Sequence, residues 1–277
     1  MRYGFYPGCS YQSSDGYRQS VKAVNEVLGI ELVELEGWNC CGATSFFSFD
    51  KKNALLLAGR IFAMANSQGF KEIVTVCNAC YAALRKAEHE FQSHPDQLDM
   101  VTRLLEQEGL NLQERAPIRH YLEILCNDLP VETWSKNGRK DISKIKVASY
   151  YGCQLVRPWK DVDDPERPVM LDLFLKRLGF SVVDHSAKTL CCGASHIFPY
   201  TKACGSLISR IVQEVLQQGG EMICTICPMC QFNLDSTQKK LVSSPLPVPY
   251  FSQLVGIRLG IEPEHLGLDK LFIPVKI

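Results

Sequence analysis

The chain has 277 residues, of which 46% are hydrophobic, with 30 basic and 30 acidic side chains that cancel. Zero net charge argues against a polyanionic partner such as nucleic acid. The start, Met1-Arg2-Tyr3-Gly4-Phe5, lacks a signal peptide's apolar region and cleavage site. No window approaches the roughly 20 apolar residues of a membrane span. We therefore expect a cytoplasmic protein whose thirteen cysteines stay reduced.

The first half of the chain alternates expected strands and helices. Short apolar runs predict strands, and apolar residues at helical spacing predict helices that stop at Gly29 and near Gly69. In order, we expect a strand over 2–7, a helix over 21–28, a strand over 30–35, a helix over 55–65, a strand over 73–76 and a helix over 81–91.

The second half repeats this order. We expect a strand over 146–150, a charged loop over 157–168, a helix over 169–178, a strand over 180–184, a helix over 207–215 and a strand over 222–226. A further echo relates residues 117–125 to 248–255, each a short strand that leads into a helix. The polar run over 132–144 is the expected linker. The sequence therefore predicts two repeats, residues 1–140 and 141–277.

Alternating strands and helices predict an α/β fold with parallel sheets. Two pseudo-symmetric repeats are expected, each a small parallel sheet flanked by helices. Ligands gather outside the carboxyl ends of parallel strands. The cysteines follow the expected strands directly, so their loops should converge at those ends.

Cysteines recur in one order in both halves. In the first half, 30 residues separate the lone cysteine from the adjacent pair, 35 separate that pair from the next cysteine, and 2 separate the last two cysteines. The corresponding numbers in the second half are 37, 34 and 2. Each half has a lone cysteine, a Cys-Cys-Gly triplet and a Cys-x-x-Cys pair. The first set is Cys9, Cys40, Cys41, Cys77 and Cys80, and the second is Cys153, Cys191, Cys192, Cys227 and Cys230. The other three, Cys126, Cys204 and Cys224, suit buried positions as small hydrophobic residues.

Five thiolates in one place are soft ligands for zinc, copper(I) or an iron–sulfur cluster. A structural zinc site or an ordinary cubane cluster takes four. Adjacent cysteines reach neighbouring metals more easily than a single metal. A fifth thiolate therefore favours an unusual polynuclear cluster in each half, with zinc as the alternative. Gly42 and Gly193 suit a close backbone approach to such a cluster.

The chain resembles the B subunit of heterodisulfide reductase, a two-repeat cysteine-rich protein of methanogens with bacterial relatives. The resemblance covers almost the whole sequence and includes the tail from Pro249 to Leu268. Its motifs are YGFYPGC over 3–9, CCG over 40–42, TVCNACY over 75–81, YGC over 151–153, ERPVML over 166–171, CCGA over 191–194 and CPMC over 227–230.

The resemblance implies that each cysteine set holds a noncubane 4Fe-4S cluster. It also implies that the two clusters face each other and that a disulfide between them is opened by one electron from each. The implied enzyme is a thiol–disulfide oxidoreductase subunit, with a ferredoxin-like C-type subunit and a flavin-containing A-type subunit as partners. Gln154 and Ser195-His196 depart from the methanogen pattern. Sulfur metabolism in the thiol- or sulfane-oxidising direction is therefore an open alternative to reduction of the methanogen heterodisulfide.

Further residues belong to this interpretation. His196 is a candidate proton donor to a departing thiolate, or else a loop histidine packed beside the cluster. Lys188, Arg157 and Lys160 are either anchors for an anionic substrate group or solvated charges. We expect a substrate pocket bordered by Thr44, Ser45, Ser195 and His196. The alternative function is a non-catalytic electron-relay or zinc-containing docking subunit.

Overall fold

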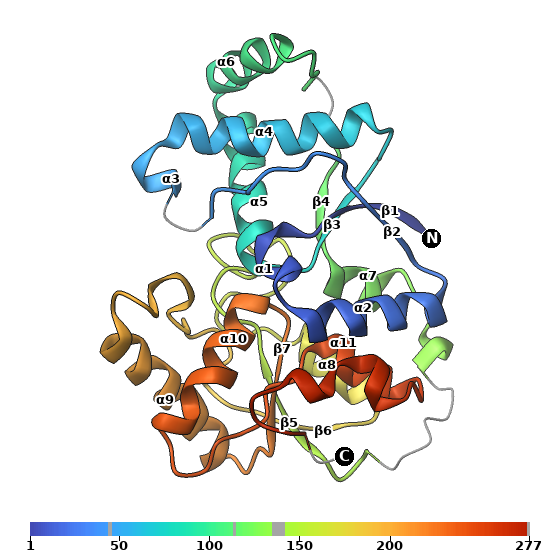
Figure 1. The fold of residues 1–277 in the computed structure, drawn as a ribbon, viewed down its shortest axis with the longest axis vertical. Helices are drawn as coiled ribbons and strands as arrows, with labels where there is room; N and C mark the ends of the chain where they lie inside the picture. Colours follow the sequence, from blue (N-terminus) through green and yellow to red (C-terminus); the bar gives the residue numbers. More distant parts are fainter. Residues whose placement is uncertain (44–45, 113–114, 135–141, 276–277) are drawn as a thin grey trace. The chain divides into compact units, whose positions relative to one another are not determined.

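The computed structural model describes residues 1–43, 46–112, 115–134 and 142–275 (Figure 1). These residues form two compact units. The first comprises the described residues of 1–12 and 29–121, and the second comprises the described residues of 13–28 and 122–275. The division differs from the expected repeats, because residues 13–28 of the first repeat pack within the second unit. The repeat boundary at 140 lies among undescribed residues and stays a prediction.

The first unit is built on a parallel sheet in the order β2-β1-β3-β4. The strands are β1 (Arg2–Tyr6), β2 (Glu31–Glu34), β3 (Ile73–Thr75) and β4 (Ile118–His120). Strand β1 pairs with both β2 and β3, as in the registers Tyr3 with Leu32 and Phe5 with Val74. The strands are short, and the central strand β3 consists of three buried β-branched residues, as in a sheet covered on both faces.

Helices α1 (Gly8–Gln12), α3 (Phe46–Phe49), α4 (Lys51–Ser67), α5 (Asn78–Ser93) and α6 (Pro95–Glu106) complete the first unit. The Asp50 side chain caps α4 by accepting a hydrogen bond from the Asn53 backbone N–H. At Gly59 in α4, a Cβ atom would lie 2.6 Å from Val101 of α6. Glycine therefore permits the close packing of these two helices.

The second unit contains a parallel sheet in the order β6-β5-β7. The strands are β5 (Lys146–Tyr150), β6 (Ser181–Val183) and β7 (Met222–Thr225). A parallel bridge joins Thr225 to Tyr250, and the Ile223 backbone N–H donates to the Pro247 carbonyl at 3.0 Å. In the first unit, Ile73 makes the same bond to Pro117 beside β4. The segment before Tyr250 thus takes the place of a fourth strand.

The second unit's helices include α7 (Tyr121–Asn127), whose first residue falls in the first unit. The others are α2 (Asp15–Leu28), α8 (Met170–Leu178), α9 (Thr201–Gln217), α10 (Pro228–Thr237) and α11 (Phe251–Arg258). Short 3-10 turns span Val131–Trp134, Ala194–His196, Gln238–Lys240, Pro263–Leu266 and Leu268–Lys270. Gly179 ends α8 with φ of 99°, a left-handed conformation that favours glycine.

Helix α2 packs against α11 and the chain that follows it. The rings of Tyr17 and Tyr250 stack with centroids 4.0 Å apart and planes at 2°. The hydroxyls of Ser20 and Ser252 lie 2.7 Å apart and are buried. A Cβ atom at Gly16 would lie 2.8 Å from the Gly267 carbonyl oxygen, so glycine allows this close approach. A segment of the first repeat is therefore part of the second unit's core.

The expected fold class is confirmed, since both sheets are parallel and flanked by helices. The expected strands agree with the observed ones within one or two residues. The echo of 117–125 in 248–255 is found as β4 with α7 and as the Tyr250 bridge with α11. Helices α1, α3, α6 and α10 are not among the expected helices. Part of the expected linker, residues 135–141, lies outside the described residues.

Candidate cysteine-rich metal centres

In the first unit, the five cysteines come from three segments of the chain. Cys9 lies in α1, just after β1, and Cys40 and Cys41 follow β2. Cys77 is the N-cap residue of α5, with extended φ and ψ of −120° and 121°, and Cys80 lies in the first turn of that helix. All three segments follow a strand's carboxyl end, as the sequence predicts for a parallel sheet.

The thiols of the first unit contact one another. The sulfur atoms of Cys41 and Cys80 lie 3.4 Å apart. Hydrogen bonds with Cys40 and then Cys80 hold the pKa of Cys41 well below its usual range. The hydrogen bond with Cys41 and burial raise the pKa of Cys40. Hydrogen bonds with Cys41 and Cys77 raise the pKa of Cys80. Cys41 is therefore the thiol that its neighbours favour most in the ionised form.

The second unit repeats this arrangement. Cys227 is the N-cap residue of α10, with φ and ψ of −130° and 127°. The sulfur atoms of Cys192 and Cys230 lie 3.5 Å apart. The hydrogen bond with Cys153 is the main cause that lowers the pKa of Cys191 to about 6, and the Gly193 backbone N–H contributes as well. The same bond raises the pKa of Cys153.

Equivalent cysteines of the two units share nearly the same burial. Each unit buries the second cysteine of the triplet and both cysteines of the Cys-x-x-Cys pair. The first cysteine of each triplet, Cys40 or Cys191, is exposed, and the lone cysteine is exposed at Cys9 and half-buried at Cys153. Each set therefore has a dry side and a side within reach of solvent.

A buried tyrosine secures each triplet from the adjacent strand. The Tyr6 hydroxyl donates to the Asn39 carbonyl at 2.8 Å, and the Tyr150 hydroxyl donates to the Leu190 carbonyl at 2.6 Å. Asn39 and Leu190 each immediately precede a triplet. Burial, followed by the charges of the nearby thiols, raises the pKa of both tyrosines, so each remains a neutral hydrogen-bond donor.

Four glycines next to these cysteines have left-handed backbones. Gly8, Gly42, Gly152 and Gly193 have φ of 69°, 72°, 67° and 75°. A Cβ atom at Gly8 would also lie 2.5 Å from the Cys80 sulfur. A Cβ atom at Gly42 would lie close to the ring of Phe46, and one at Gly193 close to the sulfur of Cys204. The expected close approach of these glycines to a cluster stays a prediction. Glycine is required at all four positions by the positive φ.

The residues present fit a thiolate-bound metal centre, and an iron–sulfur cluster is among the groups that thiolates bind. Among the described residues, no three or more His, Cys, Asp or Glu side chains are arranged to hold one metal ion. The thiols do contact one another in pairs, such as Cys41 with Cys80 in the first unit and Cys192 with Cys230 in the second. The buried hydroxyls of Thr75 and Thr225, two residues before each Cys-x-x-Cys pair, have no hydrogen-bond partner among the described residues. Such donors suit the inorganic sulfide of a cluster.

The other candidate residues divide into those near the cysteines and those engaged elsewhere. His196 is exposed, and its charge contributes to the lowered pKa of Cys191. Lys188 fits neither sequence interpretation, because its side chain is 11% exposed and pairs with Asp172 and Asp184, each at 2.7 Å. Arg157 pairs with Glu166 at 2.8 Å, and Lys160 is an exposed partner of Asp164.

The three remaining cysteines partly match their expected positions. Cys204 and Cys224 are buried, as expected, but Cys126 is half-buried. The Cys204 sulfur lies 3.6 Å from the Gly193 carbonyl oxygen, and so close to the second triplet. The spacing pattern gave no signal for this sixth cysteine near the second set.

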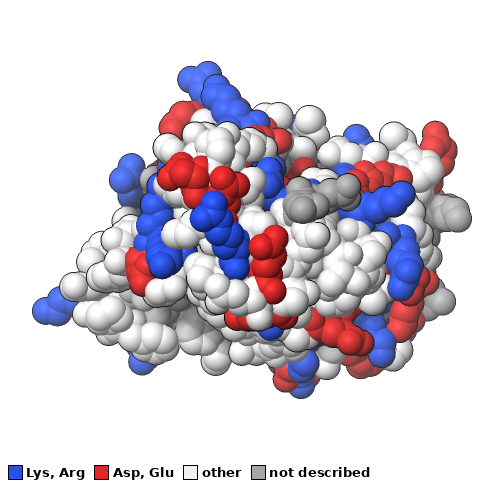
Figure 2. Space-filling view, turned by 90° about the horizontal axis from the view of Figure 1, so that it is seen from above, with Lys and Arg blue, Asp and Glu red and all other residues white. Residues whose placement is uncertain are grey.

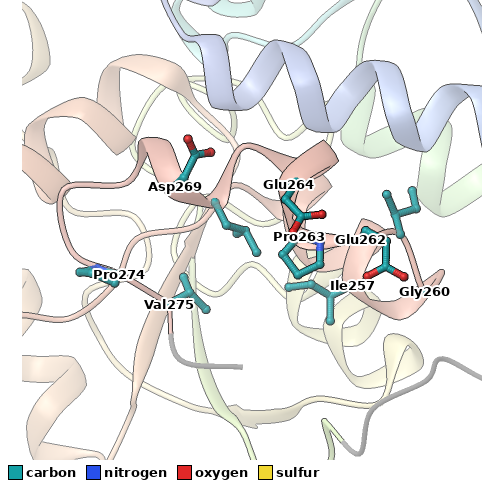
Figure 3. A pocket seen from close by; sticks show the side chains of 10 residues that line it. Ile257, Gly260, Glu262, Pro263, Glu264, Asp269, Pro274 and Val275 are labelled. Carbon is teal, nitrogen blue, oxygen red and sulfur yellow. The ribbon is translucent and has the colours of Figure 1, made fainter.

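A cavity of about 540 Å³ lies at the C-terminal end of the second unit (Figure 3). Its walls carry Ile257, Glu262, Glu264 and Asp269, and none of the ten repeated cysteines lines it. For the expected substrate pocket, Ser195 and His196 are exposed, while Thr44 and Ser45 lie outside the described residues. That pocket stays a prediction.

Surface charge agrees with the balanced composition. On the face shown in Figure 2, acidic and basic side chains are interspersed. Among the described residues, no helix combines the length and apolar character needed to cross a membrane.

Two repeats that each gather five cysteines at strand ends define a class of cysteine-rich α/β protein. The family described as "CCG: Cysteine-rich domain" matches residues 3–85 and 147–235, which hold all ten repeated cysteines. The chain belongs to this family, and carries its domain twice.

Curated relatives extend over nearly the whole chain. One is the 8-methylmenaquinol:fumarate reductase membrane anchor subunit of Wolinella succinogenes, 31% identical over 96% of this chain and 95% of its own. Another is the B subunit of the ferredoxin/F420H2-dependent CoB-CoM heterodisulfide reductase of Methanosarcina acetivorans, 31% identical over 92% and 88%. A protein of Archaeoglobus profundus, named as similar to the heterodisulfide reductase B subunit, is 25% identical over 96% and 93%. The resemblance to the B subunit of heterodisulfide reductase is thereby confirmed.

A solved structure shares the fold. A hypothetical protein from Helicobacter pylori superposes with a TM-score of 0.78 over 99% of this chain, at 12% identity. This chain spans about half of that protein, matching 52% of its length.

Proposed function

We propose that this chain is the iron–sulfur catalytic subunit of a heterodisulfide reductase-like complex. It reduces a small disulfide, or oxidises thiols or sulfane sulfur in the reverse direction. The observation that carries this proposal is the convergence of five thiols at strand ends in each unit, with the same residues exposed to solvent at each triplet. Relatives named as subunits of heterodisulfide reductases support the redox role.

The first cysteine set would hold one noncubane 4Fe-4S cluster and the second set the other. The chemistry that such clusters would supply is electron donation, one electron from each, for opening an S–S bond. The balanced reaction takes a disulfide, two electrons and two protons to two thiols. The buried thiols and the tyrosine-secured loops keep the ligands in place, and exposed Cys40 and Cys191 mark the side open to substrate.

His196 is the proposed proton donor at the second site. It is exposed and close enough to Cys191 for its charge to lower that thiol's pKa. An imidazole titrates near neutrality and can protonate a departing thiolate. Replacing His196 with Gln should slow disulfide reduction, while cluster content remains unchanged.

Electrons would arrive through a ferredoxin-like C-type subunit from a flavin-containing A-type subunit. The names of two relatives mention ferredoxin, which supports such a donor. Thirteen free thiols suit a reducing compartment such as the cytoplasm. Anaerobic purification from the native source should recover the chain together with these partners.

Metal analysis tests the central proposal. Two four-iron clusters require about eight iron and eight sulfide per chain in anaerobically purified protein. Zinc with little iron would instead support a docking subunit.

A non-catalytic role is the second candidate, because a 31% identical relative is named a membrane anchor subunit. In that role the clusters would relay electrons, and the chain would position partner subunits. Turnover separates the two candidates. The purified complex, supplied with a low-potential electron donor, should reduce a disulfide at a rate that falls when His196 is replaced. A complex that passes electrons but never consumes a disulfide or produces one would support the relay.

A further inference from the structure

The second unit contains a buried cluster of charged and polar side chains that is hydrogen-bonded to its cysteine loops. Asp172, on α8, has a side chain only 8% exposed and pairs with Lys188 at 2.7 Å. The other oxygen of its carboxylate accepts hydrogen bonds from the Ser149 hydroxyl at 2.8 Å and the Tyr151 hydroxyl at 2.9 Å. We call Ser149, Tyr151, Asp172 and Lys188 the Asp172 cluster.

This cluster connects the two loops that carry Cys153 and Cys191. The backbone N–H groups of Tyr151 and Gly152 donate to the Lys188 carbonyl at 3.0 and 3.1 Å. Gly152 immediately precedes Cys153, and Lys188 stands three residues before Cys191. Hydrogen bonds therefore connect Asp172, through Tyr151 and Lys188, to the two loops whose thiols bond to each other.

Helix α8 is bonded to the same cluster through its first turn. The Tyr151 hydroxyl accepts hydrogen bonds from the backbone N–H groups of Leu171 at 2.6 Å and Asp172 at 3.3 Å. These N–H groups belong to the first turn of α8, where no intrahelical acceptor exists. Strand β5, helix α8 and the loop before the triplet thus share one hydrogen-bonded network.

A buried ion pair such as Asp172 with Lys188 need not make a net contribution to the stability of the fold. Removing two charges from water costs several kcal/mol per ion, and an apolar replacement of similar volume is often as stable. Lys188 and Asp172 do, however, fix the positions of the groups bonded to them. Positioning is the role that their geometry supports.

The first unit secures its triplet by other means. The Arg60 guanidinium donates to the Gly37 carbonyl and to the Asn39 side-chain oxygen, both at 2.9 Å. The Asn39 amide in turn donates to the Cys40 carbonyl at 2.9 Å. Arg60 is 32% exposed and lies on α4. The two cysteine sets therefore depend on different side chains and can be perturbed one at a time.

We propose that the Asp172 cluster positions the second cysteine site by holding the Cys153 and Cys191 loops together. Lys188 and Asp172 are positioning residues that act through Tyr151, Gly152 and the Lys188 carbonyl. This inference deepens the proposed function, since it assigns part of the second site's geometry, but its first test needs no cluster.

The first test measures thiol alkylation in the full-length, cluster-free chain, with mass spectrometry to resolve each cysteine and circular dichroism to verify folding. Lys188→Met should speed alkylation of Cys153 and Cys191 by at least about tenfold, because a buried restraint is lost. Cys9 and Cys40 should react as in the wild type. Lys160→Met, which removes an exposed lysine of the same unit, is the matched control and should change nothing.

Two more variants complete this test. Arg60→Met should produce the opposite pattern, with faster alkylation of Cys40 and unchanged Cys153. If Lys188→Met does not fold, the double variant Asp172→Asn with Lys188→Met avoids the unpaired charge and is held to the same criteria. Unchanged rates at Cys153 and Cys191 in a folded variant, or equal increases at all four cysteines, would overturn the inference.

The second test uses the iron-loaded chain. Lys188→Met should alter the electron paramagnetic resonance signal or the reduction potential of one cluster and leave the other unchanged, and Lys188→Arg should restore the wild-type signal. Two unaltered signals would count against the inference. A wild-type chain that binds no iron would refute the proposed function alone, since the alkylation result stands separately.

Discussion

Replacing Tyr17 tests whether α2 belongs to the second unit's core. The Tyr17 side chain is fully buried, its ring stacks on Tyr250, and its hydroxyl lies 3.4 Å from the Ile226 carbonyl oxygen. Truncating a buried aromatic ring costs about 3–5 kcal/mol, and this includes the loss of the stacked pair. Tyr17→Ala should therefore lower the free energy of unfolding by about that amount. Tyr17→Phe keeps the stack, and should cost about 0.5–1.5 kcal/mol.

Hydrogen exchange locates the effect. Each 1.4 kcal/mol corresponds to a tenfold change, so amides of α11 should exchange about two to three and a half orders of magnitude faster in Tyr17→Ala. The matched control is Phe62→Ala, which truncates a fully buried ring on α4 in the first unit. It should affect β1 and β3 before α11. Faster exchange in β1 and β3 with unchanged α11 in Tyr17→Ala would refute the assignment of α2 to the second unit.

Four further predictions follow from single features. Asp235→Ala leaves the backbone N–H groups of Phe272 and Ile273 without their acceptor, and should cost about 2–4 kcal/mol in urea unfolding, less for Asp235→Asn. Burial lowers the pKa of His185, so the unfolded chain binds the proton more readily. Stability should therefore fall as pH drops below about 6.5, by at most about 1.4 kcal/mol per pH unit, and His185→Gln should remove that part of the slope. Cys41→Ser should abolish the first cluster and about half of the iron while the second signal persists, whereas Cys126→Ser should keep both; simultaneous loss of both would argue against independent sites. The isolated, flavin-free chain should not reduce disulfides with NADH, and robust NADH-driven turnover would contradict the proposed need for partner subunits.

Local patterns in the sequence were sufficient to predict most elements and the grouping of the cysteines. Apolar periodicity marks strands such as β5 and helices such as α8, and parallel strands bring their carboxyl ends to one edge of a sheet. The cysteine pairs seen at 3.4 and 3.5 Å follow from that topology.

Contacts between distant segments could not be predicted in this way. The partners of α2 follow it by more than 200 residues, and no local pattern identifies them. In the sequence, Lys188 resembles a surface charge because its partner, Asp172, is 16 residues away. The spacing of apolar residues around Asp172 predicts an amphipathic helix and nothing about this ion pair. The burial of a charge depends on tertiary packing, which spacing rules do not describe.

The membership of α2 in the second unit has a consequence for biosynthesis. The hydrogen bond between Ser20 and Ser252 cannot form until Ser252, 232 positions later in the chain, has been synthesised. At about 5–20 residues per second, translation takes roughly 12–46 s to cover that distance. During this interval the apolar face of α2, including Tyr17, Val21 and Val24, has no native surface to cover it. The apolar face of α2 is therefore exposed on the nascent chain for this time. A chaperone, or a partner subunit already present, can then determine whether the chain folds or aggregates.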